Sequence, residues 1–200
     1  MLPVMESVTW TEIVPSVALG IGLAACAGIR AWLPLLLAGA LARGGFIELG
    51  PAFGFMTSNR ALTLFAVATV VEIVGDKFPA VDHALDSLST VLRPAAGALL
   101  AASVMWQVSD PLTAMALGVA VGAPSALVPH AAKSLLRAGS TALTGGLANP
   151  VLSLAEDVAA VVLFILAVVV PVLLAAGLLL VALLVLRRLA RRPPSAVSAT

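Results

Sequence analysis

An uncharged apolar stretch at residues 158–186 constrains the fold of this chain more than any other feature. As a helix it would be about 43 Å long at 1.5 Å per residue, whereas the hydrocarbon core of a bilayer is about 30 Å thick. The whole chain is 61% hydrophobic and 10% charged, against about 45–50% and about 25% in soluble domains. These values exclude a soluble globular domain. They predict an all-α, polytopic transmembrane helical bundle, because helices satisfy their own backbone groups in lipid.

Charge and motifs exclude several functional classes. The formal net charge is +1, and the chain has 3 Trp, 6 Phe and no Tyr, so it offers no basic, aromatic surface for nucleic acid. No catalytic serine motif, phosphate-binding glycine loop or zinc-protease motif is found in the sequence. We therefore expect neither an enzyme nor a cofactor.

Apolar windows predict about six membrane segments, with five as the alternative. Residues 79–93 have apolar positions at helical spacing and predict an interfacial amphipathic helix, and residues 130–150 predict a broken or re-entrant segment. The last stretch gives two segments if it breaks near Pro171 and one long helix if it does not. The windows are 15–42, 61–78, 94–108, 112–129 and the stretch from 149 to 186.

An internal repeat appears when residues 18–21 are aligned with 116–119, because two ladders of small residues then coincide. The ladders are Gly20, Ala24 and Gly28, and Gly118, Gly122 and Ala126. Such ladders let helix backbones approach closely, and they suggest a homo-oligomer. Two halves of three segments would have opposite orientations, which predicts a 3+3 inverted repeat as in many secondary transporters.

The repeat divides the chain into four parts. We expect an N-terminal cytoplasmic segment (1–14), a first membrane repeat (15–108), a second membrane repeat (111–189) and a basic, disordered C-terminal tail (190–200). Basic residues favour the cytoplasmic side, so with six segments both termini are expected in the cytoplasm of a multi-pass cell-membrane protein. The count places Arg43 and Arg60 outside. It places inside Lys77, Arg93, Lys133, Arg137, Arg187, Arg188, Arg191 and Arg192.

Two charged residues, Arg30 and Glu72, lie inside predicted membrane segments. A charge at the bilayer centre costs about 2.5–3.5 kcal/mol on insertion scales, so it is usually paired or faces a cavity. We therefore expect both head groups to face the bundle interior, with Arg30 paired to a carboxylate. The pair is either part of a transport site or a device for helix packing.

Further charges complete a candidate substrate- or ion-binding site. Asp76 shares a helix face with Glu72, while His130 and Lys133 share a face with Arg137. The candidate residues are Glu72, Asp76, Glu156, Asp157, Arg30, His130 and Lys133. Carboxylates held close together in low dielectric would accept a proton, and His130 is a candidate pH-sensitive group. Alternatively, the basic face neutralises the acidic one and the cluster is structural.

A second polar cluster comprises Asp82, His83 and Asp86. It offers ligands for a divalent cation, but the same residue types are common on solvated helix faces, and no Cys or second His stands at ligand spacing. The sequence therefore does not decide whether these three residues bind a metal ion.

Several strings together resemble a bacterial membrane-protein family known as domain of unknown function 4126. The most specific is Asp-Lys-x-Pro-x-x-Asp-His at residues 76–83, and the resemblance covers about residues 17–189. The strings are GIRAWLPL (28–35), EIVGDKFPAVDH (72–83), RPAAGAL (93–99), STALTGG (140–146) and NPVLSLAED (149–157). The resemblance implies a small polytopic membrane protein and carries no activity.

These observations favour a small transporter or channel that moves an ion or small solute by means of intramembrane carboxylates. One alternative is a non-transporting scaffold, or a lipid-binding component of an envelope complex, whose charges lock helices together. A membrane enzyme using Asp82, His83 and Asp86 is a third. The expected partners are the lipid bilayer, further copies of the chain and a small ion or solute. A water-accessible cavity reaching Glu72 would favour the transporter, and a dry, paired cluster the scaffold.

Overall fold

The computed structural model describes residues 10–105 and 110–190, with side chains except those of residues 10–13, 79–86, 171–186 and 188–190. Every regular element in these ranges is helical, which confirms the predicted all-α class. The elements are α1 (Trp10–Ile29), α2 (Trp32–Arg43), η1 (Pro51–Thr57), α3 (Asn59–Gly75), α4 (Pro79–Val104), α5 (Pro111–Leu117), η2 (Gly118–Gly122), α6 (Ala123–Thr144) and α7 (Asn149–Ala190).

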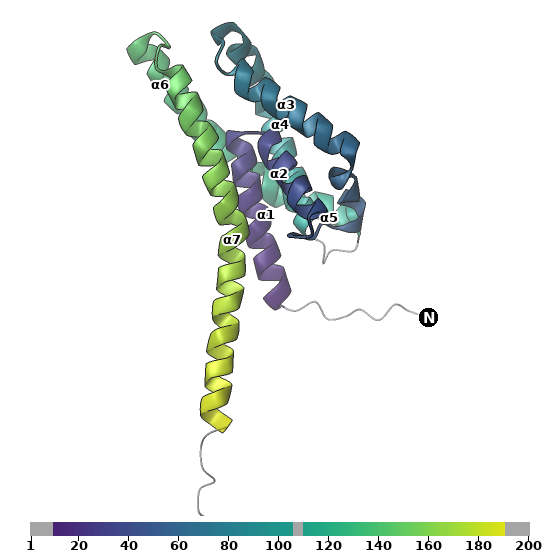
Figure 1. The fold of residues 1–200 in the computed structure, drawn as a ribbon. Helices are drawn as coiled ribbons and strands as arrows, with labels where there is room; N and C mark the ends of the chain where they lie inside the picture. Colours follow the sequence, from purple (N-terminus) through teal and green to yellow (C-terminus); the bar gives the residue numbers. More distant parts are fainter. Residues whose placement is uncertain (1–9, 106–109, 191–200) are drawn as a thin grey trace, which may run out of the picture.

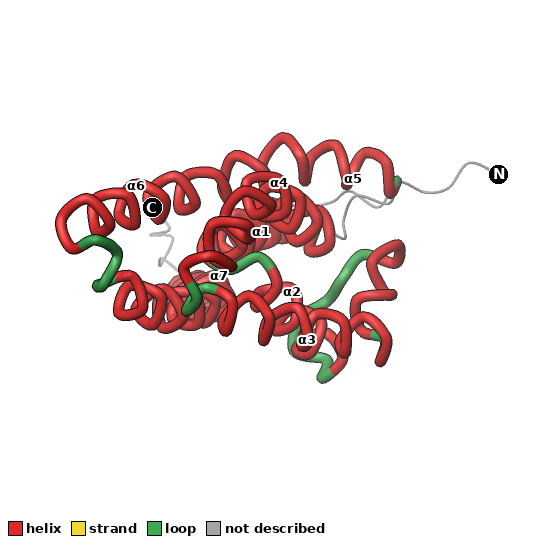
Figure 2. Tube along the Cα trace, turned by 90° about the horizontal axis from the view of Figure 1, so that it is seen from above, coloured by secondary structure: helices red, strands yellow, loops and turns green. Residues whose placement is uncertain are grey.

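Helix α1 lies at the centre of the bundle, and α4, α6 and α7 pack against it (Figures 1 and 2). Helices α2 and α3 pair with each other and with η1 on one flank. Three described stretches are long and apolar enough to cross a membrane: Ser87–Val104, Pro111–Thr144 and Asn149–Val170. The bent pair Pro51–Thr57 and Asn59–Gly75 adds a fourth if it counts as one span. These lengths support the predicted multi-pass membrane protein.

The two ladders of small residues bring helices into close contact, as expected for their spacing. A Cβ atom added to Gly28 would overlap the backbone carbonyl of Ala126. One added to Gly118 would overlap the carbonyl of Ala98, and one added to Gly20 would lie 3.3 Å from the Cα of Ala101. The ladders therefore let α1, α4 and the η2–α6 stretch pack backbone against backbone.

The predicted first segment, residues 15–42, is wrong as a single helix. The chain leaves the helical path at Arg30, and α2 then runs back beside α1 (Figure 1). Because of this reversal, the α2–α3 connection lies at the end of the bundle where α1 begins, and the α3–α4 connection lies at the opposite end. Arg43 and Arg60, at the α2–α3 connection, therefore lie at the same end of the bundle as the start of α1. The six-segment count instead places them on the side opposite the N-terminus.

Two further expected features are also corrected. The interfacial helix predicted at residues 79–93 is the first part of α4, which continues through Pro94 to Val104. In the predicted broken or re-entrant segment at 130–150, helix α6 continues to Thr144 and the break is a tight turn at residues 145–148 that leads into α7. Gly145 and Gly146 form that turn with φ of 61° and 87°, a conformation that glycine adopts without strain.

Helix α7 runs without a break from Asn149 to Ala190, past Pro171. This matches the alternative in which the last stretch is one long helix. Residues 10–14 of the predicted N-terminal segment belong to α1, while residues 1–9 and most of the predicted C-terminal tail (191–200) lie outside the described residues.

Replacing Gly28 by Ala should destabilise the protein by about 1–3 kcal/mol, since overpacking in a tight interface costs this much. A matched control is Gly139→Ala, because Gly139 is also helical and a Cβ atom there would meet nothing within 4 Å. That control should be neutral, or stabilising by up to about 1 kcal/mol. Thermal unfolding in nanodiscs would measure both effects, and equal shifts would contradict the close-packing account.

Candidate functional site

Arg30 lies at the end of α1, in the break before α2, and its side chain is fully buried. The guanidinium pairs with Asp76 through Nη1. Its Nη2 lies 2.7 Å from Oδ1 of Asp157 and donates a 3.1 Å hydrogen bond to Oγ of Ser153. One buried cation therefore ties the end of α1 to α7 and to the residue that follows α3.

Glu72 explains why the helix breaks at this point. Its Oε1 accepts a 3.1 Å hydrogen bond from the amide of Ala31, and its Oε2 accepts one of 3.3 Å from the amide of Trp32. The first amides of a helix have no partner within it, and a negative charge is favoured at this end by the helix dipole. The carboxylate of α3 thus caps the amino end of α2, with Nη2 of Arg93 3.8 Å away.

Asp76 is the centre of the cluster, and one of its oxygens, Oδ2, meets three cations. Besides Nη1 of Arg30, the Nζ of Lys133 lies 3.3 Å away and the Nη2 of Arg137 3.0 Å away. The two latter residues are four positions apart on α6 and therefore share a helix face. The acid after α3 is thereby bound to both α1 and α6.

Glu156 joins α7 to the same two residues of α6. Its Oε2 lies 3.0 Å from Nζ of Lys133, and Arg137 donates to both of its oxygens, from Nε at 3.0 Å and from Nη2 at 2.9 Å. Two parallel bonds of this kind fix the orientation of the planar guanidinium. The contact therefore sets the angle between α6 and α7 as well as their separation.

The cluster is balanced in charge. Its anions are Glu72, Asp76, Glu156 and Asp157, and its cations are Arg30, Arg93, Lys133 and Arg137. His130 accepts a hydrogen bond at Nδ1 from Nη1 of Arg93, at 2.7 Å. A buried charge without a partner is strongly unfavourable. The buried anions are therefore stable here because the cations lie beside them, and the cations because of the anions.

All seven predicted residues meet in this cluster, and the expected pairing of Arg30 with a carboxylate is confirmed. Sequence reasoning placed Arg137 on the right face without counting it as a member. It missed Arg93 and Ser153, whose only signals were the strings at 93–99 and 149–157. Arg93, Lys133 and Arg137 are buried in helices. They therefore do not count as basic residues of the connections, from which the orientation in the membrane was predicted.

The second cluster, Asp82, His83 and Asp86, lies outside the residues whose side chains are described. Among the side chains that are described, no group of three or more His, Cys, Asp or Glu residues could hold a metal ion.

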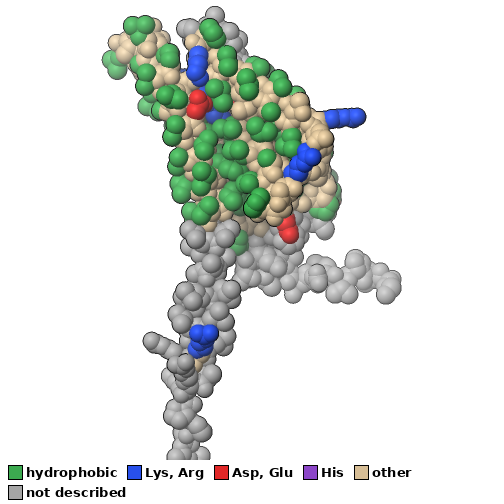
Figure 3. All heavy atoms as spheres, viewed as in Figure 1, with side chains coloured by type: hydrophobic (Ala, Val, Ile, Leu, Met, Phe, Trp, Pro, Cys, Tyr) green, Lys and Arg blue, Asp and Glu red, His purple; other side chains and the backbone are tan. Residues whose placement is uncertain are grey.

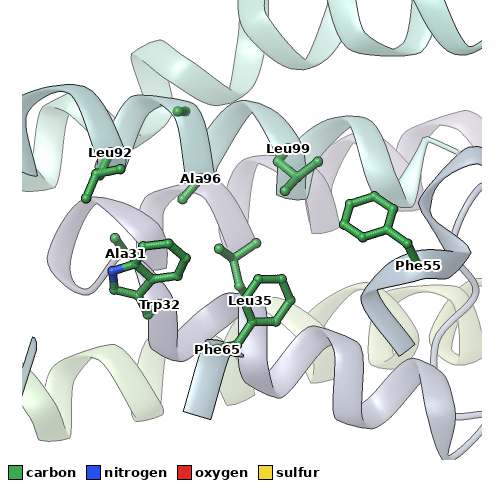
Figure 4. Close-up of a pocket in the computed structure, with 9 residues that line it drawn as sticks. Ala31, Trp32, Leu35, Phe55, Phe65, Leu92, Ala96 and Leu99 are labelled. Carbon is green, nitrogen blue, oxygen red and sulfur yellow. The ribbon is translucent and has the colours of Figure 1, made fainter. Parts of the chain in front are cut away.

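The cluster approaches the surface through its two α7 carboxylates. The side chains of Glu156 and Asp157 are 13% and 19% exposed, whereas those of Arg30, Asp76 and Lys133 are 2% exposed or less. Figure 3 shows acidic and basic side chains next to one another near the upper part of the bundle, with hydrophobic side chains around them. A neighbouring pocket between α2, α3 and α4 is lined by apolar residues and includes none of the charged groups (Figure 4).

Removing one member of the cluster should be costly. We expect Arg137→Met to destabilise the protein by about 3–5 kcal/mol, because two carboxylates lose a buried partner. Adding Glu156→Gln should restore part of the loss, since the two residues are directly coupled. Arg43→Met is the control, because Arg43 pairs with Asn59 at an exposed position and should cost about 1 kcal/mol or less. Chemical unfolding in detergent micelles would give the three values, and additive losses in the double variant would argue against the coupling.

The cap on α2 gives a second prediction. Glu72→Ala should speed hydrogen exchange at the amides of Ala31 and Trp32, because both lose their acceptor. Glu72→Gln keeps one carbonyl oxygen and should have a smaller effect. Residue-resolved exchange by NMR would measure this, and equal protection in all three proteins would show that Glu72 does not cap the helix.

Comparison with known proteins places the chain in a family. The family model described as Domain of unknown function (DUF4126) matches residues 17–191, so the chain belongs to this family. No curated protein and no solved structure matches it.

Proposed function

We propose that this DUF4126 protein is a membrane scaffold whose buried ionic cluster locks the helices of the bundle in one arrangement. The observation that carries the proposal is the mutual pairing of the charges: the four anions each lie within ion-pair distance of at least one of the four cations. This was the alternative to a transporter in the sequence-based hypotheses. A scaffold of this kind would hold a fixed surface for lipids or for other components of an envelope complex.

Competition within the cluster supports this proposal. A proton or metal cation that binds Asp76 must compete with Arg30, Lys133 and Arg137, all held at fixed positions by helix packing. These side chains are already in place beside the carboxylate, whereas an ion from water must lose its hydration shell to enter the cluster. The arrangement is therefore better suited to holding helices together than to exchanging ions.

A small transporter for an ion or solute is the second candidate, and one observation favours it. Glu156 and Asp157 are partly exposed, and Oδ1 of Asp157 is an ion-pair partner of Arg30 without an aligned hydrogen bond among the described residues. A small cation or a proton would approach the cluster through the exposed part of these two side chains, because Oδ1 of Asp157 itself is buried. The 3+3 inverted repeat, homo-oligomer formation and cytoplasmic termini would belong to this alternative.

Thermal stability in nanodiscs separates the two candidates. Wild type, Glu156→Gln and Glu72→Gln would be compared from pH 5 to pH 9 and with a panel of monovalent and divalent cations. A ligand that binds only the folded state raises its stability by mass action. The scaffold predicts that each variant is destabilised to a similar degree under every condition.

The transporter predicts a different pattern. One cation or pH step would stabilise wild type, and Glu156→Gln would lose that response. Ion flux into proteoliposomes, measured for the same cation, would then replace the scaffold proposal with the transporter.

A further inference from the structure

The apolar pocket beside the ionic cluster has a volume of about 210 Å³. It lies between α4 on one side and α2 and α3 on the other, with Phe55 of η1 at one end (Figure 4). Trp32 and Phe65 lie in it with ring centroids 6.3 Å apart. Its lining residues are Ala31, Trp32, Leu35, Phe55, Phe65, Leu92, Ala95, Ala96 and Leu99.

The pocket opens on the flank of the bundle. Ala95 is exposed, and Phe55 is 53% exposed. Leu88, one turn before Leu92 on the same face of α4, is 55% exposed. The mouth is therefore continuous with the apolar outer surface that a membrane bundle presents to lipid.

Helix α2 alone is too short to cover this flank of α4 across a membrane. Its 12 residues span about 18 Å at 1.5 Å per residue, whereas the hydrocarbon core is about 30 Å thick. Phe55 of η1 and Phe65 of α3 line the same flank, and the space left between these elements and α4 is the open pocket. In a bilayer, the material available to fill this space is the hydrocarbon of the surrounding lipids.

The chemistry of the lining selects the same occupant. Every residue of the lining is apolar, so the pocket offers water no hydrogen-bond partners and favours an apolar occupant. A polar solute would leave its hydrogen-bonding groups without partners there. The lining also offers no charged group that would recognise a lipid headgroup, so the pocket fits a chain and leaves the headgroup outside.

We propose that this pocket binds one acyl chain of a bilayer phospholipid. The acyl chain enters from the side, past Ala95, and lies between Leu99 of α4 and the rings of Trp32 and Phe65. This site does not depend on the scaffold proposal, since it involves none of the charged residues of the cluster.

Tryptophan fluorescence provides the test. The sequence has 3 Trp, so Trp10→Phe with Trp106→Phe leaves Trp32 as the single reporter. The protein would be reconstituted into phosphatidylcholine vesicles whose acyl chains carry bromine, which quenches tryptophan on contact. Strong quenching of Trp32 is expected, relative to vesicles of unbrominated phosphatidylcholine.

A blocking variant distinguishes a chain in the pocket from lipid that only surrounds the protein. Ala95→Phe places a ring in the mouth and should reduce the quenching of Trp32 about two-fold or more. Ala132→Phe is the matched control, because Ala132 is an exposed alanine of α6 outside the pocket, and it should leave quenching unchanged. Circular dichroism would check folding, and Ala95→Leu would serve as the milder block if Ala95→Phe did not fold.

Two results would overturn the proposal. Quenching that is equal in the parent, the blocked variant and the control would mean that Trp32 senses only surrounding lipid. No quenching at all would mean that another occupant, such as a helix of a partner protein or of a second copy, covers the pocket.

Discussion

The arrangement of the helices depends on the ion pairs of the Asp76 carboxylate. One of its oxygens meets Arg30 at the end of α1 and both Lys133 and Arg137 on α6. Those three cations also lie within ion-pair distance of Glu156 on α7. Four helices thus converge on one set of charges in a low-dielectric interior, where an unpaired charge is strongly unfavourable. Moving any of these helices apart would expose several charges at once.

The same need for pairing determines the local path of the chain. Arg30 must reach Asp76 and Asp157, and α1 ends at Ile29, the residue before it. The amides freed by the break are satisfied by Glu72 from α3. The small residues have a complementary role, because Gly28 lets α1 approach the backbone of α6. Close packing brings the helices near enough for short ion pairs, and the ion pairs fix their relative positions.

Much of this could be predicted from the sequence, because composition and apolar run length identify a helical membrane protein, and charges in apolar helices must find partners. The break at Arg30 could not be predicted, since it depends on Glu72, 42 positions along the chain, supplying acceptors to α2. The sequence likewise predicted separate segments on the two sides of Pro94. They form one helix, α4, because proline is tolerated within membrane helices. Arg93 was overlooked because its partners, Glu72 and His130, lie on other helices.

Hydrogen–deuterium exchange of wild type and Asp76→Asn in nanodiscs tests the central claim most directly. If Asp76 locks the bundle, its neutralisation should increase exchange together in the end of α1, in the part of α6 that carries Lys133 and Arg137, and in the start of α7. Control peptides from the far end of α2 should change little. An increase confined to the residues next to Asp76 in sequence, with the other helices as protected as in wild type, would contradict the account.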